Sequence, residues 1–205
     1  MYALIAIGYT MVYGIAKMIN FAHGDIIMAG AYFALIAMGF VGPIPAILFS
    51  IVATAALGVI TEKVAYKPLR GKGSLEVLIT AIGVSYLLQN VALLIFGSDT
   101  KAFTSVVTMK NITLFDGQLI IPGVAVVTVL ACIVIMIGLS LFIKKTKAGL
   151  AMVAVSEDKG AAQLMGINVN GTISLTFAIG SGLAAIAGVL LCSAYPSLTP
   201  YTGAM

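Results

Sequence analysis

Charged residues are scarce in this chain of 205 residues. Lysine and arginine number 11 and aspartate and glutamate 7, so 9% of the chain is charged, against about 25% in a soluble domain. With 61% hydrophobic residues and a mean hydropathy of +1.14, the chain has too few charges to cover a soluble globule. Lipid tails solvate apolar side chains directly, so the composition excludes an ordinary soluble protein and predicts a polytopic membrane protein.

Tryptophan is absent, and the chain has two cysteines and one histidine. Cys132 and Cys192 fall within apolar runs, so we interpret them as packing residues and expect neither a disulfide framework nor a metal site. No basic run is interleaved with aromatic residues, which argues against nucleic-acid binding. A single histidine, without a central carboxylate or a cluster of metal-ligand spacing, argues against an enzyme.

The sequence also lacks a phosphate-binding loop of the G-x-x-x-x-G-K-[ST] type. Residues 70–74 (RGKGS) hold fragments of this motif without the spacing needed to wrap a nucleotide. We therefore expect no cofactor in this chain.

Long charge-free runs predict six membrane-spanning helices. A helix rises about 1.5 Å per residue and needs about 20 apolar residues to cross the membrane core. The run 26–61 is too long for one helix and is broken by Gly42-Pro43-Ile44-Pro45, so we expect a helical hairpin there. The predicted fold is an all-α polytopic transmembrane bundle in one domain over residues 1–205. Its spans are 1–16, 24–41, 45–61, 75–97, 122–143 and 172–194.

Eight of the eleven basic residues lie in two segments between spans. They are Lys63, Lys67, Arg70 and Lys72 in segment 62–73 and Lys144, Lys145, Lys147 and Lys159 in segment 144–171. Short basic loops stay in the cytoplasm, so both segments are predicted to be cytoplasmic and loop 98–121 external. Six spans then place both termini outside the cell. The short first span and the uncharged last residues suggest a chain that is incomplete at both ends.

Small residues recur at every fourth position of the third span: Ala46, Ser50, Thr54 and Gly58. This spacing lines one helix face over three turns and permits close approach of another helix. The last span repeats the pattern at Gly180, Ala184 and Gly188. Packing within the subunit and a subunit interface are both compatible with it.

The fourth span carries Ser85, Gln89 and Asn90 inside its apolar run. Polar groups within a membrane are costly and are candidates for function, here the lining of a translocation path. Alternatively, the amides hydrogen-bond a neighbouring helix for about 0.6–2 kcal/mol, which we favour. No charged residue lies at the centre of a predicted span, which argues against a proton relay, a voltage sensor or an ion-coupled pump.

The histidine lies in the segment 19–25 (INFAHGD), just before an apolar run. Asn20 and Asp25 are residue types that cap helices, and we favour this structural role. Alternatively, Asn20 and His23 line the path, with the positive end of the helix dipole facing a carboxylate in transit. Because the following helix needs residues 24–40 to cross the membrane, we expect this segment near the cytoplasmic interface.

The external loop 98–121 contains two short β-prone runs, 111–115 and 118–121. Asp116-Gly117 between them is a favoured turn, so we expect a small external β-hairpin. The hairpin would contact an external partner or cap the bundle.

The cytoplasmic segment 144–171 contains a predicted short helix. Ser156 is expected to cap it, Glu157 and Asp158 to occupy its first turn, and Gly166 to end it. Its apolar residues are Ala161, Ala162, Leu164 and Met165. Too short to span a membrane, this helix is expected to dock into another protein, with an interfacial helix on the lipid surface as the alternative.

Several segments, spread along the chain, together match the sequence pattern of one known family. They are YALIAIGYTMVYG at 2–14, INFAHG at 19–24, EKVAYKPLR at 62–70, AIG at 81–83, LQN at 88–90, ED at 157–158, LMGIN at 164–168 and TPY at 199–201. Together they resemble the permease subunit of high-affinity branched-chain amino acid ABC transporters, along the whole chain. Permeases of such importers carry a coupling helix of pattern EAA-x-x-x-G, which residues 160–166 (GAAQLMG) approximate, with Gly160 in place of the glutamate.

The resemblance implies a multi-pass permease in a bacterial or archaeal plasma membrane that works by alternating access. A second permease subunit, two cytoplasmic ATPases that bind ATP and Mg²⁺, and an extracytoplasmic binding protein would be its partners. The substrates implied are leucine, isoleucine and valine. Urea or short amides are an alternative within the resemblance, which Phe21 weakly disfavours, and an autonomous membrane channel is an alternative from another class.

Overall fold

The computed structural model describes residues 2–106, 111–114 and 119–204, and nearly all of its regular structure is helical. The helices are α1 (Tyr2–Ala16), α2 (His23–Val41), α3 (Pro43–Thr61), α4 (Ser74–Phe96), α5 (Gly123–Lys145), α6 (Lys147–Glu157), α7 (Lys159–Leu164) and α8 (Val169–Ala194). Three short helical segments are η1 (Glu62–Tyr66, a π-helix), η2 (Lys67–Leu69) and η3 (Thr202–Ala204). The strands are β1 (Lys101–Ala102), β2 (Ile112–Leu114), β3 (Leu119–Ile121) and β4 (Ser197–Leu198).

The long helices confirm the predicted polytopic bundle. Five of them are long and apolar enough to cross a membrane: α2, α3 with its continuation to Leu69, α4, α5 and α8. The first predicted span corresponds to α1, which is shorter at 15 residues. The predicted hairpin is present, because Gly42 separates α2 from α3 with a φ of 81°, a conformation that glycine adopts easily.

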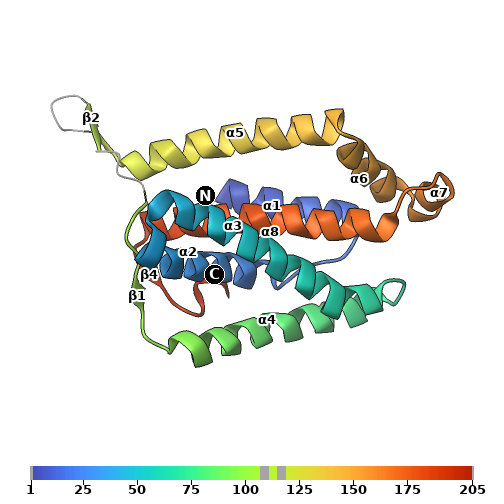
Figure 1. The fold of residues 1–205 in the computed structure, drawn as a ribbon, viewed down its shortest axis with the longest axis horizontal. Helices are drawn as coiled ribbons and strands as arrows, with labels where there is room; N and C mark the ends of the chain where they lie inside the picture. The colour runs from blue at the N-terminus through green and yellow to red at the C-terminus, as the bar shows by residue number, and fades with distance from the viewer. Residues whose placement is uncertain (1, 107–110, 115–118, 205) are drawn as a thin grey trace.

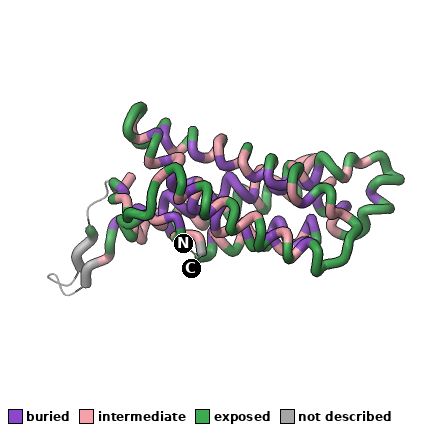
Figure 2. The backbone as a smooth tube through the Cα atoms, turned by 90° about the horizontal axis from the view of Figure 1, so that it is seen from below, coloured by how far each residue is buried: buried purple, intermediate pink, exposed green. Residues whose placement is uncertain are grey.

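Helix α8 lies at the centre of the molecule (Figure 1), and 72% of its most apolar 18-residue stretch is buried. Helices α1, α2 and α3 pack around it. Helices α4 and α5 lie at the periphery, where 22% and 6% of the corresponding stretches are buried. Figure 2 shows the buried residues along the middle of the bundle and the exposed residues on its outer helices and ends.

The small-residue face of α3 packs inside the subunit. Its four residues, Ala46, Ser50, Thr54 and Gly58, are all buried. Ser50 donates a hydrogen bond of 2.6 Å to the Gly30 carbonyl of α2, and a Cβ at Gly58 would collide with the Ser181 side chain of α8. Of the two interpretations left open by the sequence, close packing within one chain is therefore the one observed.

Two small antiparallel strand pairs lie beyond one end of the bundle. Strands β2 and β3 form the expected external hairpin in the register Ile112↔Ile121, although its turn, 115–118, lies outside the described residues. The pairing of β1 with β4 was not anticipated. Because it joins segments that are about 95 residues apart, no local pattern indicates it.

Candidate functional site

The segment between α1 and α2 returns into the bundle. After α1, Lys17 adopts a φ of 56°, and the chain then runs back along the helix that it has just left (Figure 1). A Cβ placed on Gly8, near the middle of α1, would lie 3.1 Å from the His23 ring and 3.2 Å from the Gly180 carbonyl near the middle of α8. The start of α2 therefore lies at mid-bundle depth, and the expectation of a position at the cytoplasmic interface was wrong.

The polar residues of this segment do not cap α2. Its N-cap is Ala22, which makes no side-chain capping bond. Asn20 is 3% exposed and accepts a hydrogen bond of 2.7 Å from the Tyr66 hydroxyl of η1. The Asn20 side chain makes this tertiary contact instead of capping the helix, so the favoured capping role was also wrong.

Asp25 is a buried carboxylate at the same depth, with 1% exposure. It accepts hydrogen bonds from the hydroxyl of Ser85 and, at 2.9 Å, from the side-chain amide of Gln89, both in the middle of α4. Among the described residues, no basic group pairs with it. Asp25 lies at the start of its predicted span and not at its centre, yet it reaches mid-bundle depth because residues 17–22 return into the bundle. The absence of charges at span centres therefore did not exclude a buried carboxylate.

The predicted path residues fall into three places. Asn20 and His23 lie on the returning segment and the start of α2. Ser85 and Gln89 lie on α4 and bind Asp25, two residues after His23. Asn90 lies elsewhere, since its side chain is exposed and, among the described residues, donates to the Tyr86 carbonyl of its own helix alone. Sequence spacing alone would show that Asn90 lies on another helix face than Ser85 and Gln89.

A cavity of about 430 Å³ opens beside the start of α2. Its lining residues are Tyr2, Ile5, Ala6, Tyr9, Asn20, Phe21, His23, Gly24, Ile27, Leu191, Thr202 and Gly203. Its size is in the range of small-molecule sites, and its walls are largely apolar with a few polar groups. His23 Nε2 is itself buried against Gly8 of α1 and has no hydrogen-bond partner among the described residues.

The C-terminal segment lines another side of this cavity. After α8 the chain passes through β4 to η3, which packs against α2. The contact between Gly24 and Gly203 is so close that a Cβ on either would collide with the backbone of the other. Two segments that leave opposite ends of the bundle thus meet at the start of α2 (Figure 1).

The predicted short helix is α7, but its cap differs from the prediction. Ser156 and Glu157 end α6, and Asp158 caps α7 by accepting hydrogen bonds of 2.7 and 3.0 Å from the amides of Gly160 and Ala161. Ser156 instead donates to the Val153 carbonyl of its own helix. An aspartate and a serine are equally good caps, so the local sequence does not decide between them.

Helix α7 turns part of its apolar surface outward. Ala162 is 4% exposed and packs inward, whereas Leu164 and Met165 are 90% and 83% exposed. Gly166 follows with a φ of 81° and ends the helix, as predicted. Exposed Leu164 and Met165 therefore form an apolar tip at the end of the molecule that also carries the basic loops (Figure 1).

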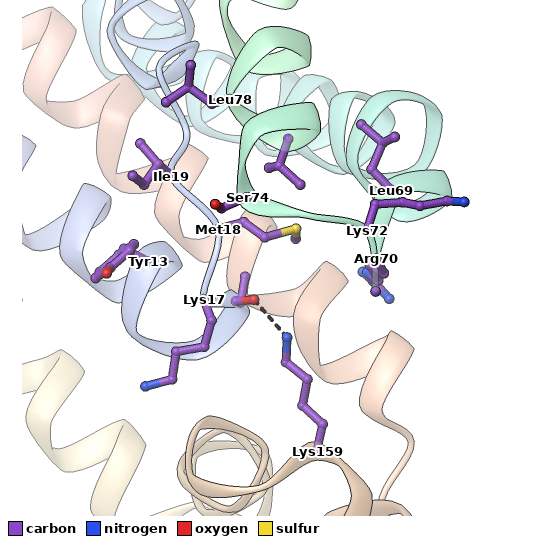
Figure 3. A pocket seen from close by; sticks show the side chains of 13 residues that line it. Tyr13, Lys17, Met18, Ile19, Leu69, Arg70, Lys72, Ser74, Leu78 and Lys159 are labelled. Atoms are coloured by element: carbon purple, nitrogen blue, oxygen red, sulfur yellow. Dashed lines mark hydrogen bonds between the residues drawn. The ribbon is translucent and has the colours of Figure 1, made fainter.

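A second cavity, of about 290 Å³, lies between α7, the end of α1 and the start of α4. Four basic residues line it: Lys17, Arg70, Lys72 and Lys159 (Figure 3). Lys159 Nζ donates a hydrogen bond of 2.9 Å to the Ala16 carbonyl at the end of α1. Burial lowers the pKa of the Lys159 ammonium, and the nearby Arg70 and Lys17 lower it further.

A buried ion pair joins η1 to α8 and was missed in the sequence. Glu62 is fully buried and pairs with Arg70, and Ser174 of α8 donates to Glu62 at 2.6 Å. Arg70 also donates to Asn170 of α8. The spacing of eight residues between Glu62 and Arg70 is no helical neighbour spacing, so only the π-helical and 3₁₀ path of η1 and η2 brings the two together.

The comparisons with known proteins extend over the whole chain. A family model described as "Branched-chain amino acid transport system / permease component" matches residues 1–205. The high-affinity branched-chain amino acid transport system permease protein BraD of Pseudomonas aeruginosa is 42% identical, over 98% of this chain and 70% of that protein. The corresponding permease protein LivH of Escherichia coli is 41% identical, over 100% of this chain and 70% of that protein.

A more distant relative is archaeal. The probable branched-chain amino acid transport permease protein LivH of Methanocaldococcus jannaschii is 32% identical, over 92% of this chain and 61% of that protein. No solved structure matches the chain significantly.

Proposed function

The chain belongs to the family of branched-chain amino acid transport permease components, and from that premise we propose that it is the membrane-spanning subunit of an ABC importer for leucine, isoleucine and valine. In this proposal a second permease subunit completes the pathway, and two cytoplasmic ATPases bind ATP and Mg²⁺. An extracytoplasmic binding protein delivers the substrate. The assembly sits in a bacterial or archaeal plasma membrane.

The single observation that carries the importer proposal is the exposed apolar tip of α7. Leu164 and Met165 are almost fully exposed although the rest of α7 is anchored, by its Asp158 cap and by buried Ala162. An exposed apolar side chain on a rigid base is what a groove in a partner protein binds. We infer that α7 is the coupling helix that docks into an ATPase.

A chain of contacts leads from α7 towards the mid-bundle site. Lys159, the first residue of α7, bonds to the end of α1, and the returning segment begins at the next residue of the chain, Lys17. Asn20 on this segment is held by Tyr66 of η1. We propose that ATPase movement at α7 shifts this segment and so opens the pathway alternately to either side.

The pathway is proposed to pass the start of α2. His23 and Asn20 line the cavity there, and Ser85 and Gln89 hold Asp25 beside it. Asn90 is not included, because its side chain is exposed on another face of α4. The surface of α5, which packs against α6, α8 and α1 and is almost wholly unburied, is available to lipid or to the second permease subunit.

The proposal is tested by reconstitution of the permease pair with its ATPases and binding protein in proteoliposomes. We expect leucine uptake that requires ATP. In Leu164→Asp, uptake and substrate-stimulated ATP hydrolysis should fall about tenfold or more, since a buried charge in an apolar groove is costly. Leu150→Asp, at another exposed leucine of the cytoplasmic segment, is the matched control and should keep most of the activity.

Two results would contradict the proposal. Leucine flux that needs no ATPase would indicate a channel. Unchanged uptake and ATP hydrolysis in Leu164→Asp would show that α7 does not contact the ATPase.

A further inference from the structure

The basic cavity between α7, the end of α1 and the start of α4 holds positive charge that the proposed pathway does not use. Four of its thirteen lining residues are lysine or arginine, and none is aspartate or glutamate. In Figure 3 the Lys159 side chain points from α7 towards the Ala16 carbonyl. Lys17, Arg70 and Lys72 lie at the edge of the cavity. Three separate segments thus bring charge of one sign to one place.

The chain itself does not neutralise the three lysines. Arg70 forms an ion pair with buried Glu62, whereas none of the lysines forms an ion pair in the described part of the chain. Burial lowers the pKa of the Lys159 ammonium, and repulsion from the nearby Arg70 and Lys17 lowers it further. An anion bound between these cations relieves the repulsion.

Two neighbouring acidic side chains are engaged elsewhere. Asp158 caps α7 by accepting hydrogen bonds from the amides of Gly160 and Ala161. The Glu76 carboxylate lies so close to Gly73 that a Cβ on this glycine would collide with it. Neither acid lines the cavity, so the lysines are left to an anion from outside the chain.

Hydrogen-bond donors accompany the charge. Lys159 Nζ donates to the Ala16 carbonyl at 2.9 Å, and an ammonium group has two further hydrogens to donate. Helix α4, 23 residues long, begins at Ser74 on the wall of the cavity, and its N-cap Gly73 forms no side-chain capping bond. The amides of a first helical turn and the positive end of the helix dipole favour an anion. A phosphate group has enough charged oxygens to accept from an ammonium and from a helix start together.

The position of the cavity indicates a phosphate group that belongs to a lipid. The cavity lies where α4, a helix long and apolar enough to cross a membrane, begins, and lipid headgroups lie at the ends of such helices. Leu75 and Ile79, each one residue after a lining residue of α4, are 66% and 60% exposed. Acyl chains can pack along this apolar surface when the phosphate lies among the lysines, whereas a soluble phosphate makes no use of it.

We propose that this cavity binds the phosphate group of an anionic phospholipid, held by Lys17, Lys72 and Lys159 and by the first turn of α4. Basic pockets between membrane helices bind anionic headgroups in this way. The bound lipid joins the end of α1, the start of α4 and the first residue of α7. The site does not depend on the proposed transport function, because it requires only that the chain spans a membrane.

Lipid binding to the full-length permease tests the proposal. The protein is purified and delipidated in a neutral detergent, and native mass spectrometry gives the Kd for phosphatidylglycerol and for phosphatidylcholine with the same acyl chains. Phosphatidylglycerol should bind about tenfold more tightly, and inorganic phosphate in tenfold excess should not displace it. Equal affinity for the two lipids would overturn the site, since acyl chains alone would then explain binding. Displacement by inorganic phosphate would overturn the assignment to a lipid.

Removal of the Lys159 charge should weaken the binding of phosphatidylglycerol. In Lys159→Gln we expect the Kd to rise about fivefold, as for one basic residue at an anionic lipid surface. Lys147→Gln is the matched control, because Lys147 is an exposed lysine of the same cytoplasmic segment that does not line the cavity. An unchanged Kd in Lys159→Gln contradicts the proposal.

A second pair of variants avoids the bond between Lys159 and α1. Lys17 and Lys72 are exposed, and their joint replacement by glutamine should raise the Kd about tenfold or more. Joint replacement of Lys63 and Lys67 by glutamine removes the same charge from exposed positions outside the cavity and should leave the Kd within about twofold. Equal weakening by the two double variants would indicate a general attraction to basic loops and would overturn the site.

Discussion

Gln89 and Asn90 are adjacent amides in α4 with opposite surroundings. Gln89 is 8% exposed and donates to the Asp25 carboxylate at 2.9 Å. Asn90 is exposed and bonds only to the backbone of its own helix. The sequence predicted that these two residues act alike, and it could not separate them without knowing which face of α4 the neighbouring helix covers.

Replacement of each amide by leucine measures this difference. Gln89→Leu leaves the buried Asp25 with one donor fewer, so we expect the free energy of unfolding to fall by about 1–3 kcal/mol. Asn90→Leu, the matched control, should change it by no more than about 0.5 kcal/mol. Thermal unfolding in detergent micelles, followed by circular dichroism, distinguishes the two. Equal losses would place Asn90 in the interior.

The close packing of helices α2, α3 and α8 depends on small residues at the points where two helices come nearest to each other. Gly58 of α3 faces Ser181 and the Phe177 carbonyl of α8, and Gly188 of α8 faces the Ile27 carbonyl of α2. In lipid, van der Waals contact between helices replaces the hydrophobic driving force. The every-fourth-residue pattern therefore predicted a close-packing face correctly, and only the folded chain identified α8 and α2 as its partners.

Alanine at Gly58 should disrupt this contact. Its added methyl group would collide with the Ser181 side chain, and overpacking of this kind costs about 1–3 kcal/mol. Gly83→Ala in α4 is the control, because nothing lies within 4 Å of its Cβ position; it should be neutral or stabilising by up to about 1 kcal/mol. The melting temperatures of the two variants test this, and a neutral Gly58→Ala would refute the α3–α8 contact.

At the scale of the whole molecule, the basic loops gather at one end and the strand pairs at the other (Figure 1). Loop 62–73 and the segment 144–171 share the end that carries α7. The hairpin of β2 and β3 lies at the opposite end. The two basic segments therefore lie on one side of the bundle. That this side, with α7, faces the cytoplasm stays a prediction from the basic residues.

Cysteine labelling tests that orientation. With Cys132 and Cys192 replaced by alanine, a single cysteine is placed at Asp99 or at Lys147, both exposed. A membrane-impermeant maleimide should label Asp99→Cys in intact cells and Lys147→Cys only after permeabilisation. The reverse labelling pattern would show that the molecule has the opposite orientation, with α7 on the side away from any cytoplasmic ATPase.

Local properties of the sequence determined much of this protein. The long helices, the Gly42 break, the β-hairpin and the Gly166 stop follow from hydropathy and turn chemistry over a few residues, and each was predicted. Helix α6 was not predicted. The cap of α7 was misassigned by two residues, from Ser156 to Asp158, because both residue types serve equally well.

The depth of His23 and Asp25 was decided only by the tertiary structure. Hydropathy assumes that an apolar helix begins at a membrane surface, whereas the segments 17–22 and 195–204 enter the bundle from its two ends and meet at Gly24 and Gly203. That meeting joins residues about 180 positions apart, so no local pattern encodes it. The sequence by itself therefore determined a membrane bundle with a short capped helix between two of its spans, and the packing of distant segments determined where its polar centre lies.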